Sequence, residues 1–125
     1  MKLQAILKIL DAQWLSGRNR RADSQNLEVL SCQASDLMSD VLTVSGEKSL
    51  LLTGLTNAQV IRVAEVSDIV AVCFVRGKRP QDEVIRLAEE RGIPLFVTSL
   101  SMYESCGHLY AQDLPAGGGP KEKPG

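Results

Sequence analysis

Residues 50–110 read LLLTGLTNAQVIRVAEVSDIVAVCFVRGKRPQDEVIRLAEERGIPLFVTSLSMYESCGHLY. Three apolar runs recur in this segment, at residues 50–53, 69–75 and 93–98, and a turn and a helical pattern follow each run. Near-continuous apolar runs are typical of strands buried on both faces, whereas strands with one solvated face alternate. The runs start 19 and 24 residues apart, close to the length that a strand–helix repeat with short loops needs. The segment therefore predicts adjacent parallel strands covered by helices.

The sequence before residue 50 adds further elements to this pattern. Leu3, Ile6, Leu7 and Leu10 recur at helical spacing and predict an amphipathic helix over residues 2–10. We expect a short strand over residues 12–16, an exposed polar loop over 18–26, and a strand over 27–34. Together with the repeat, these elements predict an α/β fold: a three-layer α/β/α domain with a small parallel or mixed sheet.

Polar residues mark the predicted starts of three helices. Asp36 is placed to cap a short helix ending near residue 43, with Leu37, Val41 and Leu42 on its buried face. Capping boxes, in which two side chains satisfy free backbone N–H groups reciprocally, are predicted at two further starts. Their residues are Thr56 with Gln59, and Ser101 with Glu104.

The helix between the second and third apolar runs has signals at both ends. Pro80 suits the first helical position, where its missing N–H is not needed. Asp82 and Glu83 in the first turn and Arg91 in the last turn complement the helix dipole. Gly92 is a natural terminator.

Length and composition indicate an ordinary small domain. The chain has 125 residues, an apolar fraction of 44% and a formal net charge of −1. We expect one domain over residues 1–114 and a disordered tail over 115–125. The near-neutral charge does not favour nucleic acid, no run is long enough to span a bilayer, and we expect a cytoplasmic protein. The three cysteines form no CxxC pair, so neither a disulfide nor a structural metal is expected.

The predicted ligand site lies at the carboxyl ends of the parallel strands, where ligands bind in open sheets. Three loops should meet there, at residues 54–57, 76–80 and 98–101, and each is expected to offer free backbone N–H groups to an anion. The second loop adds three basic side chains. The candidate ligand-binding residues are Gly54, Thr56, Asn57, Arg76, Gly77, Lys78, Arg79 and Ser99. The alternative interpretation, that these are solvated turn residues, is equally open, and no complete phosphate-binding motif is present.

Other candidate groups favour structural roles. Asp36 and Asp40 are four residues apart and would share a helix face, an arrangement that can hold Mg²⁺, but a capping and a solvated carboxylate are commoner. Cys106 and His108 would diverge on a helix and are too few for a zinc site. No cofactor, metal or catalytic residue is therefore predicted.

Four segments resemble the DRTGG domain family. They are residues 35–41, 50–54, 74–80 and 103–107, and the resemblance extends over residues 1–114. It is strongest to small stand-alone members found beside iron-only hydrogenase genes in anaerobic bacteria. The family is similar to the N-terminal domain of HPr kinase/phosphorylase, and its members also occur in some phosphotransacetylases and alongside CBS domains. The resemblance implies an α/β/α domain that is usually regulatory or ligand-sensing, often dimeric, and without an established catalytic mechanism.

Three functions are compatible with these observations. The first is a non-enzymatic regulatory domain that senses a small anionic metabolite, such as a nucleotide. The second is an accessory or scaffold protein that acts through protein contacts, for instance in a redox or hydrogenase assembly. The third is an enzyme for phosphorylated substrates in which Asp36 or Asp40 holds a metal. We also expect a homodimer, with the segments near Trp14 and at residues 27–34 as candidate interfaces.

Overall fold

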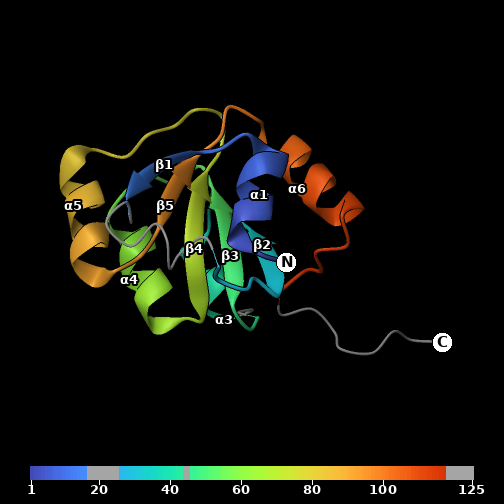
Figure 1. Cartoon of the computed structure of the whole chain (residues 1–125). Coiled ribbons are helices and arrows are strands. Elements are labelled where there is room, and N and C mark those ends of the chain that lie inside the picture. Colours follow the sequence, from blue (N-terminus) through green and yellow to red (C-terminus); the bar gives the residue numbers. More distant parts are fainter. Residues whose placement is uncertain (17–25, 44–45, 118–125) are drawn as a thin grey trace.

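A five-stranded sheet organises the chain. The computed structural model describes residues 1–16, 26–43 and 46–117 (Figure 1). Within them the strands follow the order β1-β5-β4-β3-β2 across the sheet. Strands β2 to β5 are parallel to their neighbours, while β1 runs antiparallel to β5 at one edge. Their bounds are Gln13–Ser16 (β1), Ser31–Ala34 (β2), Ser49–Thr53 (β3), Ile69–Phe74 (β4) and Leu95–Val97 (β5).

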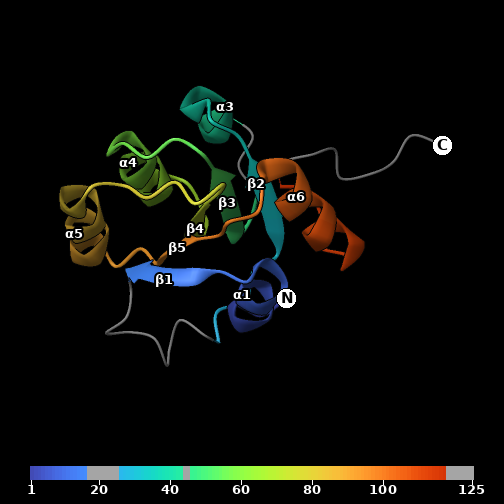
Figure 2. The same cartoon turned by 90° about the horizontal axis from the view of Figure 1, so that it is seen from above.

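Helices cover both faces of this sheet. Helices α3, α4 and α5 lie on one face, and α1 and α6 on the other (Figure 2). Their bounds are Leu3–Leu10 (α1), Met38–Thr43 (α3), Gln59–Val66 (α4), Asp82–Arg91 (α5) and Met102–Ala111 (α6). The predicted three-layer α/β/α fold with a mixed sheet is therefore confirmed, and so are the three adjacent parallel strands.

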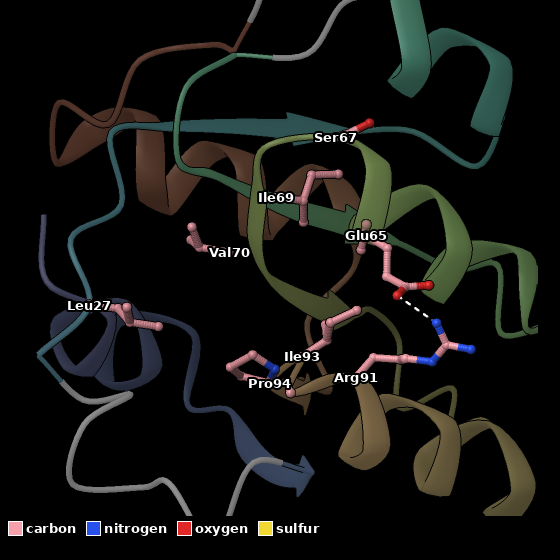
Figure 3. A pocket seen from close by; sticks show the side chains of 10 residues that line it. Leu27, Glu65, Ser67, Ile69, Val70, Arg91, Ile93 and Pro94 are labelled. Atoms are coloured by element: carbon pink, nitrogen blue, oxygen red, sulfur yellow. Dashed lines mark hydrogen bonds and ion pairs between the residues drawn. The ribbon is translucent and has the colours of Figure 1, made fainter.

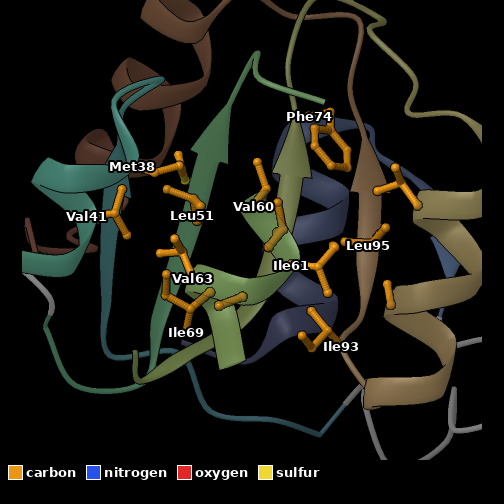
Figure 4. Close-up of a cluster of buried hydrophobic side chains, with 14 of the residues drawn as sticks. Met38, Val41, Leu51, Val60, Ile61, Val63, Ile69, Phe74, Ile93 and Leu95 are labelled. Atoms are coloured by element: carbon orange, nitrogen blue, oxygen red, sulfur yellow. The ribbon is translucent and has the colours of Figure 1, made fainter. Parts of the chain in front are cut away.

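Alternation along the buried strands divides the core into two clusters. In β3, Leu51 packs with α3, α4 and α5, whereas Leu50 and Leu52 pack with α1 and α6. Val72 and Phe74 of β4 join the first cluster (Figure 4). Both faces of the sheet are thus buried, which explains why these strands read as continuous apolar runs.

The N-terminal part of the chain departs from its prediction in one strand. Strand β2 begins at Ser31, so it covers only the second half of the predicted run at 27–34. Leu30, just before it, is 42% exposed. Of the predicted loop at 18–26, only Asn26 is among the described residues. The first half of the predicted run pairs with the N-terminal segment instead, since the Val29 N–H donates to the Met1 carbonyl at 2.8 Å and the Leu3 N–H to the Leu27 carbonyl at 2.9 Å.

The predicted cap of α3 is wrong, and of its predicted buried face only Val41 is confirmed. Asp36 lies before the helix and bonds to the β3 end instead, and the Leu37 N–H donates to Ser35 Oγ at 3.0 Å. The buried side chains of α3 are Met38 and Val41. Leu37 and Leu42 are 58% and 49% exposed.

Of three other predicted helix signals, two are present and one is absent. The capping box at Ser101 and Glu104 is present, and Gly92 ends α5 in the left-handed conformation at φ 69°. Helix α4 lacks the predicted capping box, because it begins at Gln59, whose N–H donates to the Asn57 side chain at 3.0 Å.

Helix α5 begins later than its proline suggested. It starts at Asp82, with Gln81 as the residue before it. Pro80 is therefore not its first residue. It is buried and belongs to the connecting segment.

The predicted boundary at residue 114 is too early. The Cys32 N–H donates to the Pro115 carbonyl at 2.9 Å, and the Gly117 N–H donates to the Cys32 carbonyl at 2.8 Å. Residues 115–117 therefore pair with the outer edge of β2, while residues 118–125 lie outside the described part of the chain. No helix in the described ranges is long and apolar enough to cross a membrane.

Candidate functional site

The loop after β4 is a tight turn with unusual backbone conformations. The Lys78 N–H donates to the Val75 carbonyl at 3.1 Å, which closes a four-residue turn. Its central residues, Arg76 and Gly77, have φ angles of 58° and 68°. Positive φ at both central positions characterises the type I′ turn, which glycine tolerates and arginine does not favour.

The backbone N–H groups of this turn are already used by the fold. Arg76 N–H donates to the Leu100 carbonyl and Gly77 N–H to the Thr98 carbonyl, both at 2.8 Å. These bonds tie the β4–α5 turn to the β5–α6 loop. The prediction that free amides of the turn face a ligand is therefore wrong for Arg76, Gly77 and Lys78, so an anion beside these residues would be held mainly by side chains.

The first loop is organised by Asp36, a residue that the sequence analysis assigned to a helix cap. The Gly54 N–H and the Thr53 hydroxyl donate to Asp36 Oδ1 at 2.7 and 3.0 Å. The Gly54 amide predicted for a ligand thus binds a carboxylate of the chain itself. A Cβ atom at Gly54 would lie 3.6 Å from each Asp36 carboxylate oxygen and 3.7 Å from Lys78 Cδ. The Asp36 carboxylate and the Lys78 side chain therefore both approach Gly54, and no ion pair in the described residues joins them.

Two cavities open at the carboxyl edge of the sheet, and Arg79 lines both. The smaller, of about 200 Å³, also contains Gly77 and Ser99. The larger, of about 760 Å³, also contains Thr56 and Asn57. The structure therefore brings five of the eight predicted residues to two adjoining cavities. The other three, Gly54, Arg76 and Lys78, line neither.

Charge at this edge is mixed. Arg76, Lys78 and Arg79 are exposed, and none forms an ion pair with a carboxylate of the described residues. Asp11 lines the smaller cavity and Glu83 the larger. Arg79 is therefore the basic group best placed for an anion, in surroundings that also contain acidic groups.

A further cavity of about 640 Å³ lies at the opposite end of β4, and no sequence signal indicated it. Figure 3 shows the Arg91 guanidinium paired there with the Glu65 carboxylate at 2.8 Å. These are the two charged side chains of its lining. Since these two charges neutralise each other, this cavity is less favourable for binding an anion than the edge beside Arg79.

The remaining candidate groups are not gathered for chemistry. Asp36 and Asp40 do not share a helix, because α3 starts at Met38. The described residues contain no group of three or more His, Cys, Asp or Glu side chains suited to a metal. Burial raises the pKa of the Cys32 and Cys73 thiols to about 12, the opposite of nucleophile activation.

Comparison with known proteins finds similarity to solved structures. No family model and no curated protein matches the sequence. One similar structure is the regulatory region of a Clostridium perfringens pyrophosphatase, containing CBS and DRTGG domains, in complex with the activator diadenosine tetraphosphate. The TM-score is 0.65 with 18% identity over 91% of this chain and 47% of that one. The chain thus spans about half the length of that structure. The similarity shows a DRTGG-like fold.

Proposed function

We propose that this protein is a non-enzymatic regulatory domain that senses a small phosphorylated anion, with nucleotides as the leading class. The binding site is the carboxyl edge of the sheet around Arg79. The observation that carries the proposal is the position of Arg79, which lines both cavities of this edge without an ion-pair partner in the described residues. The pyrophosphatase region of similar fold is itself regulatory and binds a nucleotide activator, which supports this class of function.

The chemistry of the edge is suited to phosphate. A guanidinium presents a rigid fork of donors that matches phosphate oxygens two at a time. Thr56 in the larger cavity and Ser99 in the smaller one carry hydroxyl groups that can add hydrogen bonds. Because the turn amides are used internally, most of the binding free energy comes from exposed side chains. Binding should therefore weaken as salt concentration rises.

The same linings favour binding over turnover. Neither cavity is lined by a histidine or a cysteine, and no hydrogen bond in the described residues joins the Ser99 or Thr56 hydroxyl to the Asp11 or Glu83 carboxylate. A ligand held at this edge would stabilise the ligand-bound conformation of the domain, as a sensor requires. The ligand itself would not be chemically changed.

A ligand panel read by thermal shift and calorimetry tests the proposal. The ligands are inorganic phosphate, pyrophosphate, AMP, ATP and diadenosine tetraphosphate. We expect a saturable rise in melting temperature with at least one of them, because a ligand that binds only the native state stabilises it. Arg79→Ala should weaken binding about tenfold or more, the effect of losing a charged hydrogen bond.

The control carries the same change of charge elsewhere. Lys78→Ala with Arg79→Ala is compared with Lys48→Ala with Arg62→Ala, which also removes two exposed cations. Only the first pair should weaken binding, and both should leave the unliganded melting temperature nearly unchanged. If both pairs weakened ligand binding equally, the interaction would depend on net charge and not on this site. Hydrolysis of any tested nucleotide would contradict a non-enzymatic role.

A second candidate function is an accessory role through protein contacts, for instance with a hydrogenase. The exposed Leu37, just before α3, and Leu42, on α3, support it, since large apolar side chains at a surface favour protein contacts. Its test is binding of a purified iron-only hydrogenase by the intact chain. Leu37→Ser with Leu42→Ser should abolish this binding, and an absence of binding by the unmodified chain would remove the candidate.

A further inference from the structure

Helix α6 carries an exposed stripe of Tyr103, Gly107 and Tyr110. These positions are four and three residues apart, so they lie on one face of the helix. The tyrosines are 88% and 73% exposed, the former being the most exposed of the large apolar residues in the described chain. Two aromatic side chains thus stand at the surface, on either side of a residue without a side chain.

Gly107 has no conformational or packing reason to be glycine. It lies inside α6, its backbone is not in the left-handed region, and a Cβ atom there would meet nothing within 4 Å. Glycine inside a helix lowers stability relative to alanine. A residue that lowers stability without a structural need indicates that the empty space above it is used.

The space above Gly107 is part of an uncharged cavity. The cavity measures about 420 Å³, within the range of small-molecule sites. Cys32 and Ala34 of β2 line it, together with Cys106 of α6 and residues 114–116. No aspartate, glutamate, lysine, arginine or histidine is among its lining residues.

We propose that this cavity is a slot for one flat, uncharged aromatic ring, such as a nucleobase, stacked between Tyr103 and Tyr110. Seven residues of helix advance by about 10.5 Å, and side chains on one face lean in the same direction, so the two rings are offset by about this distance. Aromatic rings pack with centroids about 4.5–7 Å apart, which leaves room for one ring between the tyrosines. Gly107 forms the base of the slot.

This site does not depend on the proposed anion site. The slot is lined from α6, β2 and residues 114–116, whereas the basic edge is lined from the loops around Arg79. An uncharged probe therefore tests the slot alone. A second copy of the chain or residues 118–125 are rival occupants, but a single ring matches the tyrosine spacing and the small uncharged volume most directly.

The test is binding of adenosine to the full-length chain by calorimetry, with ribose as the matched probe that lacks an aromatic ring. We expect saturable binding of adenosine and none of ribose. Tyr103→Ala and Tyr110→Ala should each weaken adenosine binding about tenfold, because each removes one stacking partner. Tyr103→Phe keeps the ring and should bind normally. His108→Ala, on the same helix outside the cavity lining, is the control and should also bind normally.

Gly107→Leu gives a readout in which stability and binding change in opposite directions. The leucine fills the slot and replaces a weak helix former, so adenosine binding should be lost while the melting temperature rises by about 4 °C. No saturable binding by the unmodified chain, or unchanged affinity in Gly107→Leu, would overturn the proposal. The same holds if the tyrosine variants change the oligomeric state and not adenosine affinity, or if removal of residues 118–125 is needed for adenosine to bind.

Discussion

Arg76 occupies a backbone conformation that L-amino acids with a side chain rarely adopt, at φ 58°. Arginine there is destabilised by about 1 kcal/mol relative to a residue that tolerates this region. Asparagine tolerates it better, so we expect Arg76→Asn to raise the free energy of unfolding by about 0.5–1 kcal/mol. Gly77→Ala places a Cβ at φ 68° and should lower it by about 1 kcal/mol. Urea denaturation of each variant measures both changes.

Lys48 provides a matched comparison for Arg76. It is also exposed and has φ 42°, but it lies in the turn before β3, at the opposite end of the sheet. Lys48→Asn should therefore give a similar gain in stability. If Lys48→Asn stabilises and Arg76→Asn destabilises, the Arg76 side chain makes a favourable contact that outweighs its backbone strain.

The three thiols should react slowly in the folded protein. Burial raises the pKa of Cys32 and Cys73 from 9.0 to about 12, and it also raises the pKa of Cys106. Near pH 8 this lowers the thiolate fraction of the first two by about a thousandfold. In alkylation with iodoacetamide followed by peptide mass analysis, we expect Cys106 to be modified first, Cys32 more slowly, and buried Cys73 only after unfolding. Rapid native modification of Cys73 would contradict its burial in the core.

Asp36 illustrates why the hydrogen-bond partners of a side chain are hard to predict from sequence. A local pattern identifies an acidic residue before a helix, but it cannot identify donors 17 and 18 positions away on β3. Thr53 and Gly54 became the partners because parallel pairing of β2 with β3 places their ends side by side. The signal available in sequence was limited to two adjacent features, a carboxylate after one strand and a Thr-Gly pair after the next.

At the scale of single elements, α6 allows a prediction about pH. Hydrogen bonds from the Ser101 backbone N–H and with its side chain lower the pKa of Glu104 below 4.5, and His108 adds a smaller effect. A lowered carboxylate pKa stabilises the fold fully above the unfolded pKa, and this contribution disappears as pH falls through the folded pKa.

Glu104→Gln isolates this contribution, because glutamine can keep the capping hydrogen bond without a titrating proton. Between pH 7 and pH 3 we expect the melting temperature of the unmodified protein to fall more than that of Glu104→Gln. The comparison is made by calorimetry at each pH. Parallel curves would mean that the native state binds the Glu104 proton as readily as the unfolded chain does.

Buried elements were the most predictable ones. Strands β3, β4 and β5 and helices α1, α5 and α6 follow from apolar period and from end signals such as Gly92, because burial of whole faces leaves a regular pattern. Strand β2 and the start of α4 were less accurate. Their boundaries depend on an edge position and on the Asn57 side chain, and neither leaves a periodic signal.

At the scale of the molecule, the parallel order β3-β4-β5 could be predicted, whereas the antiparallel β1 and the cavities could not. Arg79 lines two cavities because α5, the β5–α6 loop and the residues before β1 converge around it. The convergence of parallel strand ends let the sequence place Thr56, Asn57 and Ser99 near the basic loop, whereas Asp11 and Glu83 join the linings only in the assembled layers. The tyrosine slot likewise needs residues 114–116 beside β2, which the predicted disordered tail had excluded.

Homodimer formation remains a prediction, and the structure changes its expected location. Trp14, one of the earlier candidates, packs on Phe96 with ring centroids 4.5 Å apart and so contributes to the core. Exposed apolar side chains instead occur at α3, where Leu37 and Leu42 face solvent. A symmetric pair of chains meeting around α3 would bury apolar area from both partners, and burial of apolar area is the main favourable term in association.

Light scattering should therefore give twice the chain mass of 13.6 kDa at high micromolar concentration. Leu37→Ser with Leu42→Ser should shift the protein to a monomer with unchanged circular dichroism, because both side chains lie outside the core. Val66→Ser, which removes a 76% exposed apolar side chain on α4, is the control and should leave the dimer intact. If the unmodified protein is a monomer, these leucines are exposed to solvent and make no contact between chains. A dimer that persists in the double variant would place the contact elsewhere, with the edge strands β1 and β2 as the next surfaces to test.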